Sequence, residues 1–315
     1  MHTKQPFFTV FIPTYNRAEL LPRALESIRD QTFRDFDVVI VDDGSSDATR
    51  EVVAAWRQVV DFPVTYVGQE NAGKIAAYNN AMSYIDGFMM VLLDSDDELV
   101  PEALQRYYDQ WHKIPERERE HYAGVEGLSM VMPSGRIAGE SFPEDGMTSN
   151  YPEMRFKFAV SGDKRHALRT SVMQEYPFPL FEGEKHNRES LVWCRMAQKY
   201  VFRYFNEVVQ RVYYQPDGLS SLTPSRRRQS PKGFSLAFLE MINDHADVCS
   251  ARQLRRDAAN YVRYALHAGT SLSEQYHRVR DKKVWWRALP GGVAHWCADR
   301  SLSLLQGNSI RDKSS

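Results

Sequence analysis

The first 110 residues alternate short apolar runs with amphipathic stretches. The apolar runs predict buried strands over residues 7–13, 37–41, 64–67 and 88–93. The stretches between them have helical spacing and predict helices over residues 18–30, 48–60 and 74–85. Strands that alternate with helices at this spacing build a parallel sheet with right-handed crossovers. The pattern therefore predicts an α/β fold in which helices flank a mostly parallel, Rossmann-like sheet.

The regular alternation of strands and helices ends near residue 110, and the rest of the chain falls into further parts. Residues 111–215 are less regular, and a helix is expected near their end. Residues 216–233 combine three Pro and two Gly with several Ser and an arginine run, a composition typical of a mobile loop or linker. We therefore expect one domain over 1–215, made of the halves 1–110 and 111–215. A linker over 216–233 and a helical extension over 234–315 should follow it.

Composition narrows the class of protein. The chain is 43% hydrophobic and 26% charged, as in an ordinary globular protein, and its net charge of −1 argues against a nucleic-acid partner. Three widely spaced cysteines fit a reducing compartment. The sequence has neither the pattern of a signal peptide nor an apolar run long enough to span a membrane. These features together predict a cytoplasmic location.

The C-terminal region is basic and rich in tryptophan. Residues 251–315 carry twelve Lys and Arg against five Asp and Glu, a net charge of +7. Trp285, Trp286 and Trp296 lie among these basic residues, a composition suited to the inner face of a cell membrane. Two interpretations stay open, since the basic surface could simply be solvated and the aromatic rings could pack in a core.

The segment Asp94-Ser95-Asp96-Asp97 follows directly after the apolar run that ends at Leu93. Acidic residues at this position lie at the carboxyl edge of the sheet, where open α/β folds bind ligands. Carboxylate oxygens suit Mg²⁺ or Mn²⁺, and these ions in turn suit a phosphate-bearing substrate. The alternative is a solvated acidic turn, and for Asp97 we favour the role of cap of the next helix.

Four motifs in chain order resemble those of the inverting family 2 glycosyltransferases, enzymes with the GT-A fold that act on nucleotide sugars. These motifs are Val10 to Arg17, Val38 to Ser46, Gly73 with Ala77 and Asn79, and Asp94-Ser95-Asp96. The resemblance covers residues 7–110 most strongly, extends more weakly over 155–215, and implies a nucleotide-binding half and an acceptor half in the first domain. It also implies a dependence on Mn²⁺ or Mg²⁺.

The resemblance assigns roles to individual residues. Those implied to bind the nucleotide sugar are Pro13, Thr14, Tyr15, Arg17, Asp42, Asp43, Lys74, Asp94 and Ser95. Tyr15 would pack against the base, and Asp43 would accept a hydrogen bond from the base or ribose. Asp96 would be the principal metal ligand, with Asp94 beside it. Lys74 would face the nucleotide, although its side chain could equally be solvated.

The resemblance also implies a catalytic base, usually an acidic pair four residues before a tryptophan. Counting back from Trp193 reaches Glu189, but Arg188 stands where the first acid of the pair is often found. This departure leaves Glu184 and His186 as alternatives. A further interpretation is that Glu189 only stabilises the start of a helix through the helix dipole.

The expected function is therefore metal-dependent, inverting transfer of a sugar to a saccharide hydroxyl, in the synthesis of a bacterial surface polysaccharide or glycan. A UDP-sugar is the default donor, and the acceptor could be linked to polyprenyl diphosphate. Asp163, Lys164 and Arg165 are candidates for acceptor contacts, or else part of a polar turn. The alternatives are a catalytically impaired protein that binds sugar nucleotides or glycans, and a sugar nucleotidyltransferase. The sequence does not specify the donor sugar, the linkage or the oligomeric state.

Overall fold

The computed structural model describes residues 5–215 and 227–311, which fall into two compact units. The first unit comprises residues 1–178 and 192–218, and the second comprises residues 179–191 and 219–315. The predicted domain over 1–215 differs from this division in one segment, because residues 179–191 group with the C-terminal helices.

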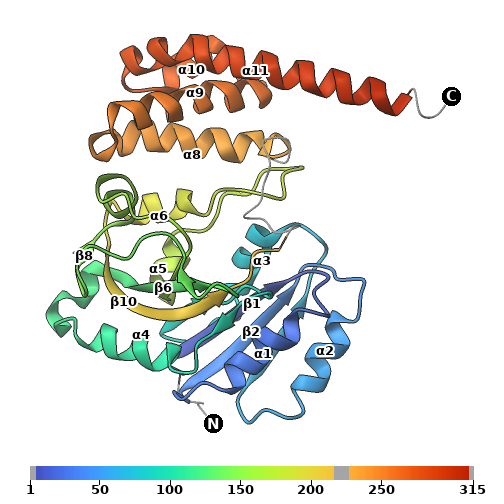
Figure 1. The fold of residues 1–315 in the computed structure, drawn as a ribbon, viewed down its shortest axis with the longest axis vertical. Helices are drawn as coiled ribbons and strands as arrows, with labels where there is room; N and C mark the ends of the chain where they lie inside the picture. The colour runs from blue at the N-terminus through green and yellow to red at the C-terminus, as the bar shows by residue number, and fades with distance from the viewer. Residues whose placement is uncertain (1–4, 216–226, 312–315) are drawn as a thin grey trace. The chain divides into compact units, whose positions relative to one another are not determined.

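A ten-stranded sheet forms the centre of the first unit (Figure 1). Its main path runs in the order β3-β2-β1-β4-β9-β6-β10-β5, with β7 beside β6 and β8 beside β10. The strands are β1 Phe8–Thr14, β2 Phe36–Asp42, β3 Val64–Gly68, β4 Met89–Leu92, β5 Glu98–Leu99, β6 Tyr122–Val131, β7 Arg136–Ile137, β8 Thr148–Ser149, β9 Lys164–Arg169 and β10 Val201–Val212.

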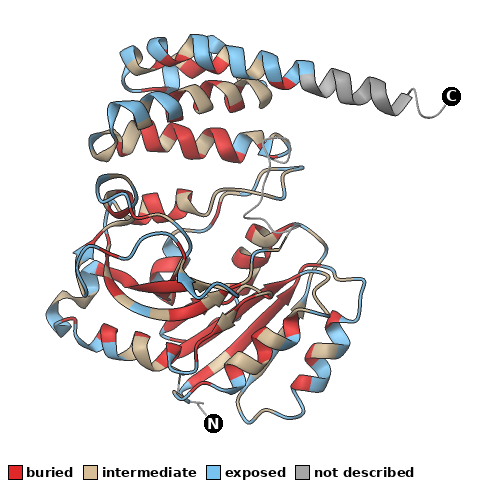
Figure 2. Cartoon of the chain, viewed as in Figure 1, coloured by how far each residue is buried: buried red, intermediate tan, exposed pale blue. Residues whose placement is uncertain are grey.

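The first half of this sheet is parallel, as the sequence pattern predicts. β1 pairs in parallel with both β2 and β4, and β2 pairs in parallel with β3. All seven residues of β1 are buried because helices cover both faces of the sheet (Figure 2). The α/β fold with flanking helices is thereby confirmed.

The second half adds antiparallel pairs, so the sheet as a whole is mixed. β9 runs antiparallel to both β4 and β6. β10 runs parallel to β6 and antiparallel to β5 and β8. These strands come from distant parts of the chain, and their direction depends on long-range pairing that a local hydrophobic pattern does not encode.

Side chains of alternate strand positions build two cores on opposite faces of the sheet. Phe8, Val10 and Ile12 of β1 belong to one core, and Phe11 belongs to the other. The first core includes residues from α1 (Leu21–Arg29), α2 (Thr49–Trp56) and α4 (Ala103–His112). The second includes residues from α3 (Lys74–Ala81), α5 (Thr170–Glu175) and α6 (Ser190–Met196). Short helical turns, η1 (Glu116–His121) and η2 (Glu153–Lys157), complete the unit.

The second unit consists of helices around a core of its own. They are α8 (Pro231–Asp244), η4 (Ala246–Val248), α9 (Ala251–His267), α10 (Leu272–Arg278) and α11 (Lys282–Arg311). The ring of Phe238 on α8 stacks on Tyr264 of α9, with centroids 5.9 Å apart. The buried carboxylate of Asp299 on α11 accepts hydrogen bonds from Arg263 and Arg228. The predicted helical extension is therefore present.

Some sequence expectations fall elsewhere in the structure. α8 begins at Pro231, inside the segment predicted as linker, while the part of that segment at residues 216–226 lies outside the described residues. Trp285 is 3% exposed and belongs to the helical core, whereas Trp286 is 59% exposed. In the part of the chain that the structure describes, we find no helix with the length and apolar content needed to cross a bilayer.

Candidate active site

The loops after β1 and β2 are joined by hydrogen bonds at the carboxyl edge of the sheet. The Asn16 amide donates to the Ser45 hydroxyl at 2.8 Å, and the Asn16 side-chain oxygen accepts from the Ser46 amide at 2.8 Å. Asn16 has a φ of +50°, a left-handed conformation that asparagine tolerates. The buried carboxylate of Asp42 accepts from the Ser45 amide at 2.8 Å and from the Tyr66 hydroxyl. These bonds make the two loops a single preorganised surface.

The carboxylate of Asp43 organises the chain that leads into α3. It accepts three hydrogen bonds at 2.8 Å, from the Gln69 side chain and from the amides of Ala72 and Gly73. Gly73 has a φ of +94°, which favours glycine, and directly precedes the helix. Asp43 therefore fixes the start of α3, the helix whose first residue is Lys74.

The predicted residues of the first loop differ in exposure. Pro13 and Thr14 are buried at the end of β1, and the Tyr15 ring is 47% exposed. The Arg17 amide donates to the Thr49 hydroxyl at 3.1 Å, which ties the loop to α2. Tyr15 is thus the exposed member of this group.

Asp94 lies between two basic side chains that the sequence places far apart. Its carboxylate is 2.7 Å from Nζ of Lys74 and accepts a hydrogen bond from Arg165 at 2.9 Å. Burial disfavours the charged form of Asp94, but Lys74 and Arg165 outweigh it and hold the pKa of this carboxyl well below its usual range. Asp94 is therefore ionised and held in place at neutral pH. Arg165, a candidate for acceptor contacts, lies at this cluster.

Asp97 does not cap the following helix, so that sequence prediction is wrong. It is 6% exposed, and its carboxylate accepts from the Gln210 side chain at 2.5 Å and from the Tyr213 amide at 3.0 Å. Burial and the nearby charge of Asp94 raise its pKa to about 7, against the opposing effect of Arg165. Asp97 anchors the end of β10 to the turn after β4.

Asp96 lies between Asp94 and Asp97 in the turn after β4. Unlike theirs, its carboxylate forms no ion pair or hydrogen bond with another residue in the described part of the chain. Its backbone oxygen accepts from Arg23, and Ser95 before it is 7% exposed. Burial and the charge of Asp94 raise the pKa of Asp96, while Arg17 lowers it.

These residues are compatible with Mn²⁺ or Mg²⁺. Among the described residues, no group of three or more His, Cys, Asp or Glu side chains could hold a metal ion. A hard cation held by one or two carboxylates and by substrate phosphates does not require such a group. Asp96 offers for this purpose a carboxylate that has no ion pair with the described residues, while Asp94, two residues away, is already bound to Lys74 and Arg165.

The three candidates for acceptor contacts have different partners in the structure. Asp163 accepts a hydrogen bond from the Tyr214 hydroxyl at 2.7 Å. Lys164 donates to two backbone oxygens, those of Ala138 and Ser161. Arg165 instead contacts Asp94, so the structure connects it with the carboxylates rather than with its sequence neighbours.

All three candidates for catalytic base, Glu184, His186 and Glu189, belong to the second unit. Glu184 accepts hydrogen bonds from the amides of Lys232 and Gly233 at 2.8 and 2.9 Å, so its carboxylate caps the start of α8. Glu189 is half-buried and directly precedes α6. Arg188 packs on the Phe238 ring, 4.8 Å from its centroid.

Several residues at or near the candidate active site are not among the candidates of the sequence analysis. Arg23 of α1 covers the Tyr213 ring at 3.5 Å, and Gln210 of β10 binds both Arg165 and Asp97. Glu126 of β6 is buried, which raises its pKa to about 7 despite the nearby charges of Lys164 and Arg165. A single acid within an apolar strand is the only signal that pointed to Glu126. The others come from elements that carry no recognisable motif.

Comparison with protein families matches residues 9–117 to the model described as glycosyl transferase family 2. GalNAc(5)-diNAcBac-PP-undecaprenol beta-1,3-glucosyltransferase of Campylobacter jejuni is 24% identical over 273 residues, 83% of this chain and 82% of the relative. Poly(ribitol-phosphate) beta-N-acetylglucosaminyltransferase TarS of Staphylococcus aureus is 31% identical over 290 residues, 90% of this chain. The chain spans 48% of the length of TarS, and 14% of another relative, glycosyltransferase GlyA of Streptococcus pneumoniae.

Solved structures share the fold. The crystal structure of S. aureus TarS 1–349 in complex with UDP has a TM-score of 0.59 at 16% identity, covering 93% of this chain and 91% of that one. Mannosyltransferase PcManGT from Pyrobaculum calidifontis, in complex with GDP-Man and Mn²⁺, has a TM-score of 0.56 at 19% identity, covering 94% and 88%.

Proposed function

We propose that this chain, whose residues 9–117 match the model of glycosyl transferase family 2, transfers a sugar from a UDP-sugar to a saccharide hydroxyl with inversion at the anomeric carbon. The observation that carries the proposal is the cluster at the carboxyl edge of the parallel strands. There Lys74 and Arg165 hold Asp94 ionised, beside the unpaired carboxylate of Asp96. Such an edge is where open α/β sheets bind nucleotides.

The donor site would be built on the joined loops after β1 and β2. The exposed ring of Tyr15 offers a stacking surface for the base, and Pro13, Thr14 and Arg17 belong to the same loop. Asp42 and Asp43 would act mainly by fixing the neighbouring backbone, since their carboxylates already accept hydrogen bonds from it. Fold neighbours solved with UDP and UDP-GlcNAc support the choice of a uridine nucleotide.

The leaving diphosphate needs positive charge near it, and Lys74 and Arg165 supply part of that charge. Asp96, with Asp94 and Ser95 in the same turn, would hold Mn²⁺ or Mg²⁺, which when bound supplies further stabilisation of the leaving group. A fold neighbour solved with GDP-Man and Mn²⁺ supports this assignment.

Glu189 is our proposed catalytic base. Its carboxylate would take the proton of the acceptor hydroxyl as that oxygen bonds to the anomeric carbon and the bond to the diphosphate breaks. Glu184 is less suited to this role, because both of its oxygens accept hydrogen bonds from backbone amides of α8.

The acceptor is proposed to be a saccharide linked to polyprenyl diphosphate, contacted by Asp163 and Lys164 and reached from the cytoplasmic face of a membrane. The relative from C. jejuni bears the name of such a lipid-linked substrate. The net charge of +7 over residues 251–315 and the exposed ring of Trp286 support peripheral attachment to an anionic membrane. Synthesis of a surface polysaccharide or glycan would be the setting.

The test is release of nucleoside diphosphate from a panel of sugar nucleotides with Mn²⁺, with and without lipid-linked saccharide acceptors. We expect Asp96→Asn and Glu189→Gln each to lower kcat by about 100-fold or more, because one removes a metal ligand and the other the base. Asp30→Asn and Glu182→Gln are the matched controls, since both acids are exposed and neither belongs to the proposed site.

Binding of a donor without turnover, for every acceptor tried, would instead favour a catalytically impaired protein that binds sugar nucleotides. Formation of a sugar nucleotide from a sugar phosphate and UTP would favour a nucleotidyltransferase. Full activity of Asp96→Asn would contradict the metal assignment, and full activity of Glu189→Gln would return Glu184 to consideration.

A further inference from the structure

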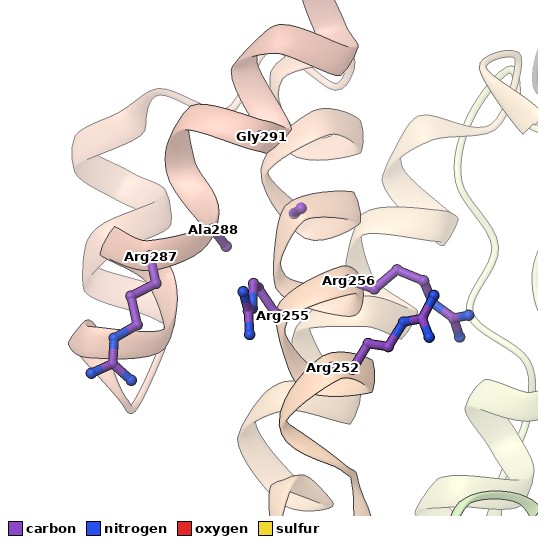
Figure 3. Close-up of a pocket in the computed structure, with 7 residues that line it drawn as sticks. Arg252, Arg255, Arg256, Arg287, Ala288 and Gly291 are labelled. Atoms are coloured by element: carbon purple, nitrogen blue, oxygen red, sulfur yellow. The ribbon is translucent and has the colours of Figure 1, made fainter.

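A cavity of about 540 Å³ lies between α9 and α11 in the second unit, and arginines line it (Figure 3). Arg252, Arg255 and Arg256 come from the first two turns of α9, and Arg287 comes from α11. Small residues of α11, including Gly291, complete the wall and leave the space open. The volume is within the range of sites that bind small molecules.

Three of the four arginine charges at this cavity are not neutralised by an acid in residues 227–301. Within residues 227–301, Arg252, Arg255 and Arg287 are exposed and form no ion pair. Arg256 lies 3.6 Å from the buried carboxylate of Asp257, and no acidic residue lines the cavity itself. In Figure 3 the Arg255 side chain extends between the two helices, while Arg252, Arg256 and Arg287 border the hollow from either side, and an excess of like charge of this kind favours an anion.

The location of three of these arginines at the start of α9 also favours an anion. Ser250 caps this helix, with its hydroxyl accepting from the Gln253 amide at 3.2 Å, and the three arginines follow within its first six residues. The positive end of the helix dipole therefore reinforces the arginine charges. Guanidinium groups also form paired hydrogen bonds with phosphate oxygens, whose geometry matches their planar fork.

We propose that this arginine cavity binds a phosphate or diphosphate group. The site uses no residue of the proposed donor site, and it does not depend on the proposed transfer reaction. Two sources could present this chemistry, an anionic lipid headgroup and a free phosphate compound, and the experiment has one arm for each.

The first arm measures binding of inorganic pyrophosphate by calorimetry, using the full chain without divalent cations. The second measures sedimentation with phosphatidylglycerol vesicles against phosphatidylcholine vesicles. Arg252→Gln combined with Arg255→Gln removes two cavity charges, and Arg278→Gln combined with Arg300→Gln removes two charges elsewhere in the same unit.

A second pair of variants tests the cavity by filling it. A Cβ added at Gly291 would meet only the Cβ of Ala259, at 4.0 Å, so a side chain can enter without displacing the backbone. Gly291→Glu and Gly291→Gln place side chains of nearly equal size there, and only the first adds a negative charge. Thermal unfolding of each variant verifies that it is folded.

We expect the double cavity variant and Gly291→Glu to weaken binding by about tenfold or more relative to their controls, because charge-assisted hydrogen bonds are lost or opposed. Loss in the pyrophosphate arm assigns a free phosphate compound, and loss in the vesicle arm alone assigns a lipid headgroup. Equal binding by cavity variants and controls overturns the proposal. So does the absence of binding to both probes in the unmodified chain.

Discussion

Asp94, Asp97 and Glu126 are carboxylic acids of one unit whose pKa values move in different directions. Lys74 and Arg165 contact Asp94 directly and keep it ionised despite its burial. Asp97 and Glu126 are more deeply buried, and each has a pKa raised to about 7. The first unit therefore holds a fixed negative charge at Asp94 beside acids that change protonation near neutral pH.

Glu126 gives a prediction about stability and pH. Its pKa rises from 4.5 to about 7 on folding, mainly through burial. The contribution of Glu126 to the free energy of unfolding is therefore fully present below pH 4.5 and is lost as the pH rises through 7. Glu126→Gln cannot titrate. We expect the variant to gain about 2–3 kcal/mol in free energy of unfolding relative to the unmodified protein between pH 4.5 and 8.

Urea unfolding at several pH values measures this difference. Glu116→Gln is the control, because Glu116 is exposed and its replacement should shift stability equally at each pH. A stability difference between Glu126→Gln and the unmodified protein that stays constant across the range would contradict the raised pKa.

The sequence could identify individual acids but not all of their partners. Asp94 and Lys74 were assigned to the same site from a resemblance, and the structure brings them within 2.7 Å. The bonds of Asp97 to Gln210 and Tyr213 join residues more than 110 positions apart, and no local pattern encodes such a contact. For the same reason Glu126 is not among the candidates of the sequence analysis, since its burial depends on pairing of β6 with β9 and β10.

The contact between α9 and α11 depends on two adjacent glycines that differ in surroundings. A Cβ at Gly292 would lie 2.5 Å from the Cβ of Val262 and 2.7 Å from the Ala259 oxygen. A Cβ at Gly291 would have the Ala259 Cβ as its nearest neighbour within 4 Å, at 4.0 Å. Gly292 therefore permits close approach of the helices, and Gly291 faces open space.

These two glycines form a matched pair of substitutions. We expect Gly292→Ala to lower the free energy of unfolding by about 1–3 kcal/mol, because the added methyl group overlaps backbone and side chain of α9. Gly291→Ala should raise it by about 0.5–1 kcal/mol, because alanine has the higher helix propensity and meets no obstacle. Urea unfolding followed by circular dichroism gives both values. Equal effects of the two substitutions would contradict this packing.

Helices and strands differ in how well the sequence predicts them. The apolar runs place β1, β2 and β3 within a few residues of their observed bounds. In contrast, Pro290, Gly291 and Gly292 ordinarily interrupt a helix, yet α11 continues through them because Gly292 packs closely on α9. The start of α8 within the predicted linker is likewise fixed by a distant residue, Glu184, whose carboxylate caps it.

The unit that carries the proposed donor site and the helical unit differ in electrostatic character. The formal charge of the chain is −1, but residues 251–315 carry +7 and the remainder carries the balancing negative charge. A diphosphate bound at the proposed donor site would require positive charge near it, because the carboxylates of Asp94 and Asp96 lie in the same turn. Lys74 and Arg165 are partly engaged with Asp94, so a divalent cation would supply what they do not.

This requirement predicts that metal and nucleotide bind together. Asp94 is already bound to two basic side chains, which leaves Asp96 as the carboxylate free to hold a cation. One carboxylate binds Mn²⁺ weakly, so Mn²⁺ alone should change the melting temperature by less than about 1 °C. Mn²⁺ with UDP at about 100 times its Kd should raise it by about 4–6 °C, because diphosphate oxygens complete the coordination.

Differential scanning fluorimetry of the full chain tests this coupling. A chelator added to the UDP sample should return the melting temperature to that of the free protein, and Asp96→Asn should abolish the combined effect while Asp30→Asn preserves it. A full shift with UDP and chelator would mean that Lys74 and Arg165 suffice to hold the diphosphate. A full shift with Mn²⁺ alone would require further protein ligands and would contradict a site that depends on Asp96 and the nucleotide.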